Sequence, residues 1–282
     1  MSEFVVDRHP WNRDFEWTGA TPPFRVVSEA QAEQFDLDGF VVIPEVFDAS
    51  TLAPIVEEID RFEAETEDAL RRLDGERISI AEAGAITFTT HLVKRSPALR
   101  AFATHPFFTG ICADLIGPDV NLYWDQAVYK KPEKPRRFPW HQDNGYTFVE
   151  PQQYLTCWVA LTDATPTNGC PHVAPGLHRL GTVVHHFVDP LGWECLSDPT
   201  GTVAAPVGAG GVVVFSSLTP HLTGPNTTDN VRKAYILQYA LMGAQIMRGN
   251  PAAGEPQSVE GCDDPARQFP VVRGGQACAP TA

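Results

Sequence analysis

The chain has 282 residues, of which 43% are hydrophobic and 20% charged, and its formal net charge is −14. This composition is that of a globular protein able to bury a core, and the acidic balance argues against nucleic-acid binding, which needs a basic surface. Neither a secretory signal nor an apolar run of the roughly 18 residues that span a membrane is expected. The six cysteines show no Cys-x-x-Cys pair, which is typical of free thiols in a reducing cytoplasm, with a Cys262–Cys278 bridge as the one alternative. We expect a cytoplasmic monomer or homodimer.

The first part of the chain is mainly helical by its residue pattern. Helices are predicted at about residues 28–39, 48–75 and 97–116, the last one interrupted near Pro106. Ser28 and Gln31 form a capping box at the first helix, and apolar residues recur at helical spacing in the second. A strand is predicted at residues 40–43. None of these helices contains a candidate metal ligand.

From Val120 onward, short β-rich runs separated by turns replace the helices. They are predicted at residues 120–131, 154–161, 183–188, 211–215 and 234–241. This order predicts a mainly β protein with flanking α-helices and a double-stranded β-helix core, a cupin-like jelly roll. We expect a single domain over residues 1–282, with its core at about 28–245 and an irregular C-terminal tail at 246–282.

One group of residues in the β-rich part has the chemistry of a metal site. His141 and Asp143 are two residues apart before an apolar strand, and in an extended segment both would point to the same face. His221 follows the apolar run 211–215 after a short polar turn. Two imidazoles and one carboxylate on one face of an iron leave the opposite positions open, as in non-heme oxygenases. Arg232, at the start of the last clear strand, offers a bidentate fork for a carboxylate.

A His-x-Asp triplet alone is weak evidence, but it stands among other motifs in a fixed order. Their sequences are Asp38-Gly39-Phe40-Val41-Val42-Ile43-Pro44, Pro139-Trp140-His141-Gln142-Asp143, Cys157-Trp158-Val159-Ala160-Leu161-Thr162-Asp163, Asn168-Gly169-Cys170, Ala174-Pro175-Gly176-Leu177-His178 and His221-x-Thr223-x-x-Asn226 up to Arg232. This order resembles the phytanoyl-CoA dioxygenase family of Fe(II)/2-oxoglutarate-dependent oxygenases, from about Gly39 to Met242. Leu177 stands where the family usually has Ser, in a turn that is structural.

The resemblance implies roles for individual residues. His141, Asp143 and His221 would be the iron ligands and the catalytic centre. Arg232 would pair with the distal carboxylate of 2-oxoglutarate, helped by the Thr223 hydroxyl. Trp158 would form a wall of the cosubstrate pocket and Gln126 would contact the cosubstrate. Lys131 is a further cosubstrate candidate, although neighbouring Lys130 could take its place, and Phe88 lies where many members have a basic residue.

Substrate contacts are predicted for two residues that follow the iron motif and for one upstream histidine that could border the substrate pocket. Tyr146, Asn144 and His91 are the candidates, and residues 188–207, with Trp193, are the expected lid or specificity loop. The basic cluster made of Lys130, Lys131, Lys134, Arg136 and Arg137 could steer an anionic molecule to the site or form a solvated loop.

The implied reaction uses Fe(II), 2-oxoglutarate and O2, and it releases succinate and CO2. Hydroxylation of a small organic metabolite is the expected outcome, and Asp143 favours oxygenation over halogenation. Desaturation, cyclisation or epoxidation at the same site stay open, as do an acyl-CoA, an amino acid or a specialised metabolite as substrate. Two competing hypotheses are a non-catalytic metal-binding jelly roll and a dioxygenase that needs iron but no 2-oxoglutarate.

Overall fold

A computed structural model describes residues 6–132 and 138–278 of the chain. The helices are α1 (Glu29–Asp38), α2 (Ala49–Arg71), α3 (Pro97–Phe102), α4 (Pro106–Leu115) and the single turn α5 (Asp143–Tyr146). The long strands are β1 (Phe40–Ile43), β4 (Ile86–Thr90), β5 (Val120–Lys130), β7 (Leu155–Ala160), β12 (Val212–Ser216) and β14 (Arg232–Leu241). The shorter strands are β2 (Arg77–Ile78), β3 (Ala81–Glu82), β6 (Val149–Glu150), β8 (Pro171–Val173), β9 (His186–Val188), β10 (Gly192–Glu194), β11 (Val203–Ala204), β13 (His221–Thr223), β15 (Gln245–Arg248), β16 (Ser258–Gly261), β17 (Pro270–Arg273) and β18 (Gln276–Ala277).

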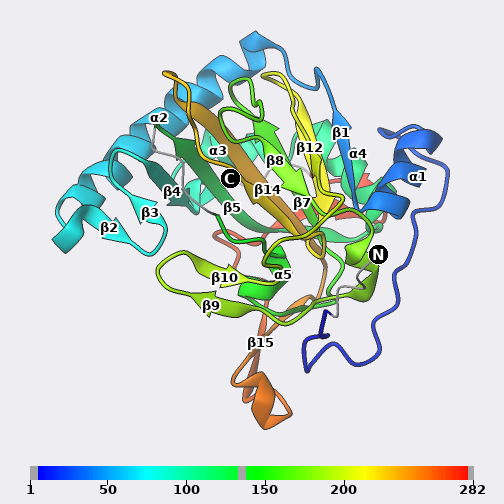
Figure 1. Ribbon diagram of the computed structural model, residues 1–282. Helices are drawn as coiled ribbons and strands as arrows, with labels where there is room; N and C mark the ends of the chain where they lie inside the picture. The colour runs from blue at the N-terminus through cyan, green and yellow to red at the C-terminus, as the bar shows by residue number, and fades with distance from the viewer. Residues whose placement is uncertain (1–5, 133–137, 279–282) are drawn as a thin grey trace.

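The main sheet is antiparallel and runs in the order β1-β12-β7-β14-β5-β4-β3-β2. A smaller sheet, β11-β8-β13, faces it, and the helices α2 to α4 pack against the other face of the main sheet, with α2 along the upper left of the view (Figure 1). The fold is therefore the expected jelly roll with flanking helices.

Two apolar cores lie on the two faces of the main sheet because neighbouring residues of a strand point to opposite sides. Ile59 of α2 and Phe108 of α4 pack with Tyr235 in the core on the helix side. Trp158 and Phe215 point the other way, into the core between the two sheets. That second core forms the floor beneath the predicted metal ligands.

The predicted helix starts at Ser28 and Asp48 are confirmed by their caps, whereas α2 ends at Arg71, before the predicted end at Gly75, which lies in a 3-10 turn (Asp74–Glu76). The Ser28 hydroxyl accepts from Gln31 N, and Ser28 N donates to the Gln31 side chain, as a capping box requires. Gly39 ends α1 with a φ of +80°, and a Cβ at this position would come 2.5 Å from the Thr219 hydroxyl. Glycine is needed here for both its backbone conformation and its small size. The expected interruption near Pro106 separates α3 from α4.

The structure corrects two expectations for the strands and the tail. Only residues 186–188 of the run 183–188 form a strand. The prediction of an irregular tail at 246–282 is wrong where residues 246–248 continue β15 and where β16, β17 and β18 form. Strand β17 pairs with the start of β5, at Val120 and Asn121, and Phe269, Val271 and Val272 are buried in the helix-side core. The Gly- and Pro-rich composition of the tail hides this short apolar segment.

All six cysteines have free thiols, and Cys262 is buried. No helix within residues 6–132 and 138–278 is long and apolar enough to cross a membrane.

Candidate metal centre

The two histidines of the predicted site are brought together by the backbone. His141 and His221 form an antiparallel bridge between segments that are far apart in the sequence. His141 N donates to His221 O at 3.0 Å, and His221 N donates to His141 O at 2.8 Å. The ring centroids are 4.3 Å apart. The main chain alone therefore holds the two imidazoles side by side.

Each imidazole is oriented by a hydrogen bond from its Nδ1 to a backbone carbonyl. His141 Nδ1 lies 3.2 Å from Pro139 O, and His221 Nδ1 lies 3.0 Å from Thr219 O. A carbonyl only accepts, so each Nδ1 carries a proton, and in a neutral ring this leaves the lone pair on Nε2. Burial, together with the neighbouring His221, lowers the pKa of His141 well below its ordinary value. His141 is therefore a neutral ring, the form that binds metals.

Asp143 provides the carboxylate of the group. It is the first residue of α5, and its Oδ1 lies 3.8 Å from His221 Nε2. Its Oδ2 accepts a hydrogen bond of 2.6 Å from the hydroxyl of Thr156, a buried residue of β7. This bond fixes the carboxylate while Oδ1 stays directed at the imidazoles.

Gln142, between the two ligands, anchors the motif. Its side chain is fully buried, and its Nε2 donates to Gly181 O at 3.0 Å and to Leu218 O at 2.6 Å. Its Oε1 accepts from Val183 N at 2.8 Å. The middle residue of the triplet therefore points away from its two neighbours and ties the segment to the protein interior.

The three predicted ligands fit a metal ion of the iron type. Their ligand atoms lie within 4.8 Å of one another, and His141, Asp143 and His221 form the one such group in the described part of the chain. Two neutral imidazoles with one carboxylate are the donor set of the facial triad that binds non-heme Fe(II).

A cavity of about 510 Å³ opens beside this group. His141 and Asp143 line it, together with Gln126, Thr223 and Tyr146 among the other residues predicted for the site. The Tyr146 ring packs edge-on against His141, with a centroid distance of 5.0 Å. Phe88 lines the same cavity, at the position where the sequence lacks a basic residue.

Arg232 and Trp158 lie on the neighbouring strands β14 and β7, and neither is among the residues that line the cavity. Arg232 is fully buried, and its Nη1 donates to Val128 O at 3.1 Å. Its guanidinium carbon lies 5.1 Å from the centre of the Trp158 ring. The structure thus buries a permanent cation beside Trp158 in the main sheet.

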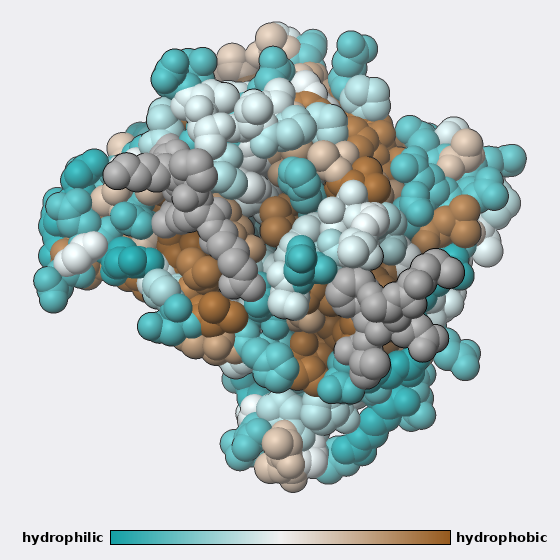
Figure 2. All heavy atoms as spheres, in the orientation of Figure 1, coloured by the Kyte–Doolittle hydropathy of each residue, from teal (hydrophilic) through white to brown (hydrophobic). Residues whose placement is uncertain are grey.

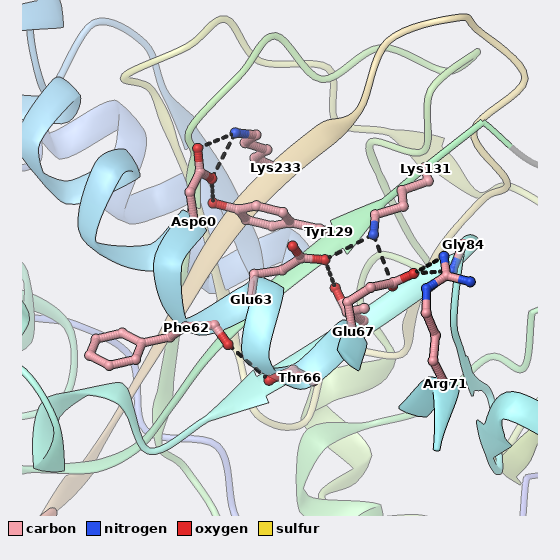
Figure 3. A network of polar contacts seen from close by, with 11 residues as sticks. Asp60, Phe62, Glu63, Thr66, Glu67, Arg71, Gly84, Tyr129, Lys131 and Lys233 are labelled. Carbon is pink, nitrogen blue, oxygen red and sulfur yellow. Dashed lines mark hydrogen bonds and ion pairs between the residues drawn. The ribbon is translucent and has the colours of Figure 1, made fainter. Parts of the chain in front are cut away.

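Lys131 is directed away from the cavity. Its Nζ lies 2.8 Å from Glu67 Oε2 and 3.3 Å from Glu63 Oε1, both on α2 (Figure 3). Lys130 points to the opposite face of the sheet, where its Nζ donates to Thr223 O at 2.7 Å. Lys134, Arg136 and Arg137 of the basic cluster lie outside the described residues.

Two of the predicted substrate residues do not line the cavity. Asn144 is buried, and its amide donates to the Thr182 hydroxyl at 2.6 Å and accepts from Val149 N at 2.9 Å. His91 packs edge-on against Trp124, with a centroid distance of 4.3 Å, and Trp124 is the residue that reaches the cavity. These two side chains therefore support the walls of the site.

Sequence reasoning missed Thr156 and much of the cavity lining. The lining that it missed consists of Ile78, Ile80, Ala81, Ile86, Tyr123, Trp124, Phe138, Pro139, Thr147, Tyr154 and Gln238. Thr156, Tyr154 and Gln238 lie on or beside strands that were predicted, so strand alternation was the signal that could have placed them on the site's face. Residues 78–81 lie in a turn-rich stretch without a strand pattern, and no local signal marks them.

Comparison with known proteins places the chain in a family. A family model described as phytanoyl-CoA dioxygenase (PhyH) matches residues 35–234. The chain belongs to the phytanoyl-CoA dioxygenase family. It is 25% identical over 234 residues to a methylphosphonate hydroxylase of Gimesia maris, covering 79% of this chain and 84% of that protein. It is likewise 25% identical over 239 residues to an ectoine dioxygenase of Bordetella bronchiseptica, covering 77% of this chain and 76% of the relative.

Solved structures of related enzymes share the fold. The epimerase SnoN, solved with Fe3+, alpha-ketoglutarate and nogalamycin RO, superposes with a TM-score of 0.62 at 25% identity, covering 83% of this chain and 93% of SnoN. EvdO2 from Micromonospora carbonacea, solved with 2-oxoglutarate, gives a TM-score of 0.62 at 26% identity, covering 83% of this chain and 99% of EvdO2.

Proposed function

We propose that this PhyH-family chain is an Fe(II)- and 2-oxoglutarate-dependent oxygenase that hydroxylates a small organic molecule. The observation that carries the proposal is the convergence of His141, Asp143 and His221 beside a cavity of about 510 Å³. Iron and 2-oxoglutarate, when bound, supply the oxidising chemistry, with consumption of O2 and release of succinate and CO2. The protein supplies binding, orientation and exclusion of water.

Each residue of the site has a distinct task in this proposal. His141 and His221 present their Nε2 atoms to the iron, because carbonyl groups hold their Nδ1 protons. Thr156 holds Asp143 in the orientation that completes the triad. Arg232, a buried cation, binds the distal carboxylate of 2-oxoglutarate, and Thr223 and Gln126 add polar contacts from the cavity wall. The aromatic lining keeps water from the reacting centre.

Known relatives support oxygenation and leave the product open. The two curated relatives are named a hydroxylase and a dioxygenase, whereas SnoN is named an epimerase. We therefore propose hydroxylation for this chain, with the retained carboxylate of Asp143 as its structural support. A reducing cytoplasm fits the six free thiols.

The test begins with cosubstrate binding. Under anaerobic conditions, the purified protein with Fe(II) and 2-oxoglutarate should give the weak visible metal-to-ligand absorption band of this enzyme class. His141→Ala should abolish the band. Arg232→Met should weaken 2-oxoglutarate binding at least about tenfold through loss of a charged hydrogen-bonded pair, whereas Arg232→Lys should retain part of it.

Two results would contradict the proposal. A wild-type protein that binds iron but never develops the band with 2-oxoglutarate would be a metal-binding jelly roll or an oxygenase of another type. If Arg232→Met bound 2-oxoglutarate as tightly as the wild type, the assignment of Arg232 would be wrong although the enzyme class could stand. Succinate release measured across candidate substrates, with His141→Ala as the blank, separates catalysis from binding.

A further inference from the structure

Two hairpins meet over the mouth of the cavity. The first, residues 77–82, contains β2 and β3 and continues the main sheet next to β4. The second, residues 186–194, contains β9 and β10 and lies beside α5 (Figure 1). The Ser79 hydroxyl at the tip of the first donates to Pro190 O at the tip of the second, at 3.0 Å. We call these two hairpins together the clasp.

Both halves of the clasp are anchored at their bases. At the first hairpin, Glu67 of α2 accepts from Gly84 N at 2.8 Å and pairs with Lys131 (Figure 3). At the second hairpin, Cys195 N donates a hydrogen bond to Trp140 O at 2.8 Å. Gln142 N, from the metal-ligand segment, donates to His185 Nε2. The clasp is thus built onto α2 on one side and onto the metal-ligand segment on the other.

Apolar side chains are exposed on the clasp and beside it. Ile78 of the first hairpin is 62% exposed, Phe187 and Trp193 of the second are 56% and 39% exposed, and Tyr146 of α5 is 48% exposed. Figure 2 shows hydrophobic surface where the two hairpins approach each other. Large apolar side chains gathered at the mouth of a cavity mark a place where an apolar ligand is bound.

The cavity behind the clasp is lined mostly by apolar and aromatic groups. Six aromatic side chains contribute to it: Phe88, Tyr123, Trp124, Phe138, Tyr146 and Tyr154. Its remaining polar groups are neutral amides and hydroxyls, apart from the metal ligands His141 and Asp143. Among the described residues, no lysine, arginine or glutamate lines the cavity. Among the described lining residues, a charged part of the substrate would therefore meet no side chain of opposite charge apart from the metal ligands.

We propose that the substrate is an uncharged molecule with a bulky, ring-bearing apolar body, held between the two hairpins of the clasp. The proposal rests on the oxygenase function proposed above and specifies its substrate class. Aromatic walls bind flat ring systems through their faces and edges, and the cavity volume is in the range that accepts a drug-sized ligand. A phosphonate, a zwitterion or an acyl-CoA thioester has charges that this lining does not match.

The experiment uses two fluorescent probes with the same rings and different charge. N-phenyl-1-naphthylamine is neutral, and 8-anilino-1-naphthalenesulfonate is the same molecule with a sulfonate added. Each is titrated into the wild-type protein loaded anaerobically with Fe(II) and 2-oxoglutarate. We expect the neutral probe to bind at least about tenfold more tightly, because the sulfonate is desolvated without compensation.

Matched variants show whether the probe binds at the clasp. Ile78→Asp should weaken binding of the neutral probe at least about fivefold, because it places a charge against the apolar ligand. Leu37→Asp is the control, since Leu37 is similarly exposed, at 57%, but lies on α1. Both positions are on the surface, and circular dichroism checks that both variants fold. Ile80→Asp, in the same hairpin and also lining the cavity, is the second variant if the first fails to fold.

The results distinguish the substrate class from the enzyme class. Tighter binding of the neutral probe than of the sulfonate by the wild type, together with weaker binding of the neutral probe in Ile78→Asp and unchanged binding in Leu37→Asp, supports the proposal. Equal or tighter binding of the sulfonate, or equal weakening by both variants, overturns it while the Fe(II)/2-oxoglutarate band still forms. Absence of that band in the wild type would instead overturn the oxygenase function.

Discussion

The hydrogen bond from Thr156 to Asp143 gives a sharp test of how the metal site is held. Thr156→Val keeps the shape of the side chain and removes the hydroxyl that donates to Asp143 Oδ2 at 2.6 Å. A hydrogen bond to a charged group contributes about 1.5–3 kcal/mol, which corresponds to about 10- to 150-fold in affinity. The Asp143 side chain is 14% exposed, so water can replace part of the lost bond. We therefore expect Fe(II) affinity to fall about tenfold, the low end of this range.

The assay is an anaerobic Fe(II) titration at saturating 2-oxoglutarate, followed by the visible absorption band. Thr156→Ser is the matched control because it keeps the hydroxyl, and its affinity should stay within about threefold of the wild type. Thermal denaturation without metal checks that the valine variant is folded. Unchanged Fe(II) affinity in Thr156→Val would refute the argument that this hydroxyl positions the carboxylate.

Three further predictions follow from other contacts. Burial raises the pKa of Asp125 to about 6. A raised carboxyl pKa gives stability that is complete below the unfolded value near 3.8 and is lost as pH rises through 6, so the stability of Asp125→Asn relative to wild type should increase by about 3 kcal/mol between pH 3 and pH 8. A pH-independent difference in urea unfolding would contradict this. Ser79→Ala removes the bond between the hairpin tips, so amide exchange in residues 77–82 and 186–194 should accelerate several-fold while that in β12 stays unchanged; equal exchange in both proteins would show that the tips are held by other contacts. Gln142→Met leaves Val183 N, Gly181 O and Leu218 O without their hydrogen-bond partner. This should lower the free energy of unfolding by at least about 3 kcal/mol. A loss below about 1 kcal/mol would mean that water replaces the amide.

The jelly roll and the metal ligands could be predicted from the sequence for two reasons. The strands have local residue patterns, and the ligand motifs follow one another in a fixed order. The long strands are apolar runs between turn formers, and β5, β7, β12 and β14 were found at nearly their observed positions. His141 and Asp143 stand two residues apart, and they reach one site as expected. The bridge that brings in His221 could be inferred only from motif order, since no local pattern specifies a partner 80 residues away.

Side-chain direction explains what the sequence could not show. Lys130 and Lys131 are adjacent, and the alternation of a strand sends one between the sheets and the other to α2. Which lysine points which way depends on the pairing of Arg232 with Lys130, a tertiary contact. Asn144 follows a metal ligand in the sequence, but α5 is a helical turn, so neighbouring side chains diverge and Asn144 faces the interior.

The first hairpin of the clasp, residues 77–82, also could not be predicted from the sequence. Each of its strands has only two residues, too few to show alternation, and Ser79 has a φ of +54° that no sequence pattern announces. Its position over the cavity depends on Glu67 and Lys131, which lie far apart in the sequence (Figure 3).

The backbone bridge between His141 and His221 has a thermodynamic consequence for metal loading. A site whose ligands become ordered only when the ion arrives must spend part of its binding free energy on that ordering. Here the peptide groups and the carbonyl partners of both imidazoles have already removed most of that freedom. Metal occupancy is therefore expected to depend mainly on ion concentration and donor preference, and exchange of one divalent ion for another should proceed without refolding of the chain.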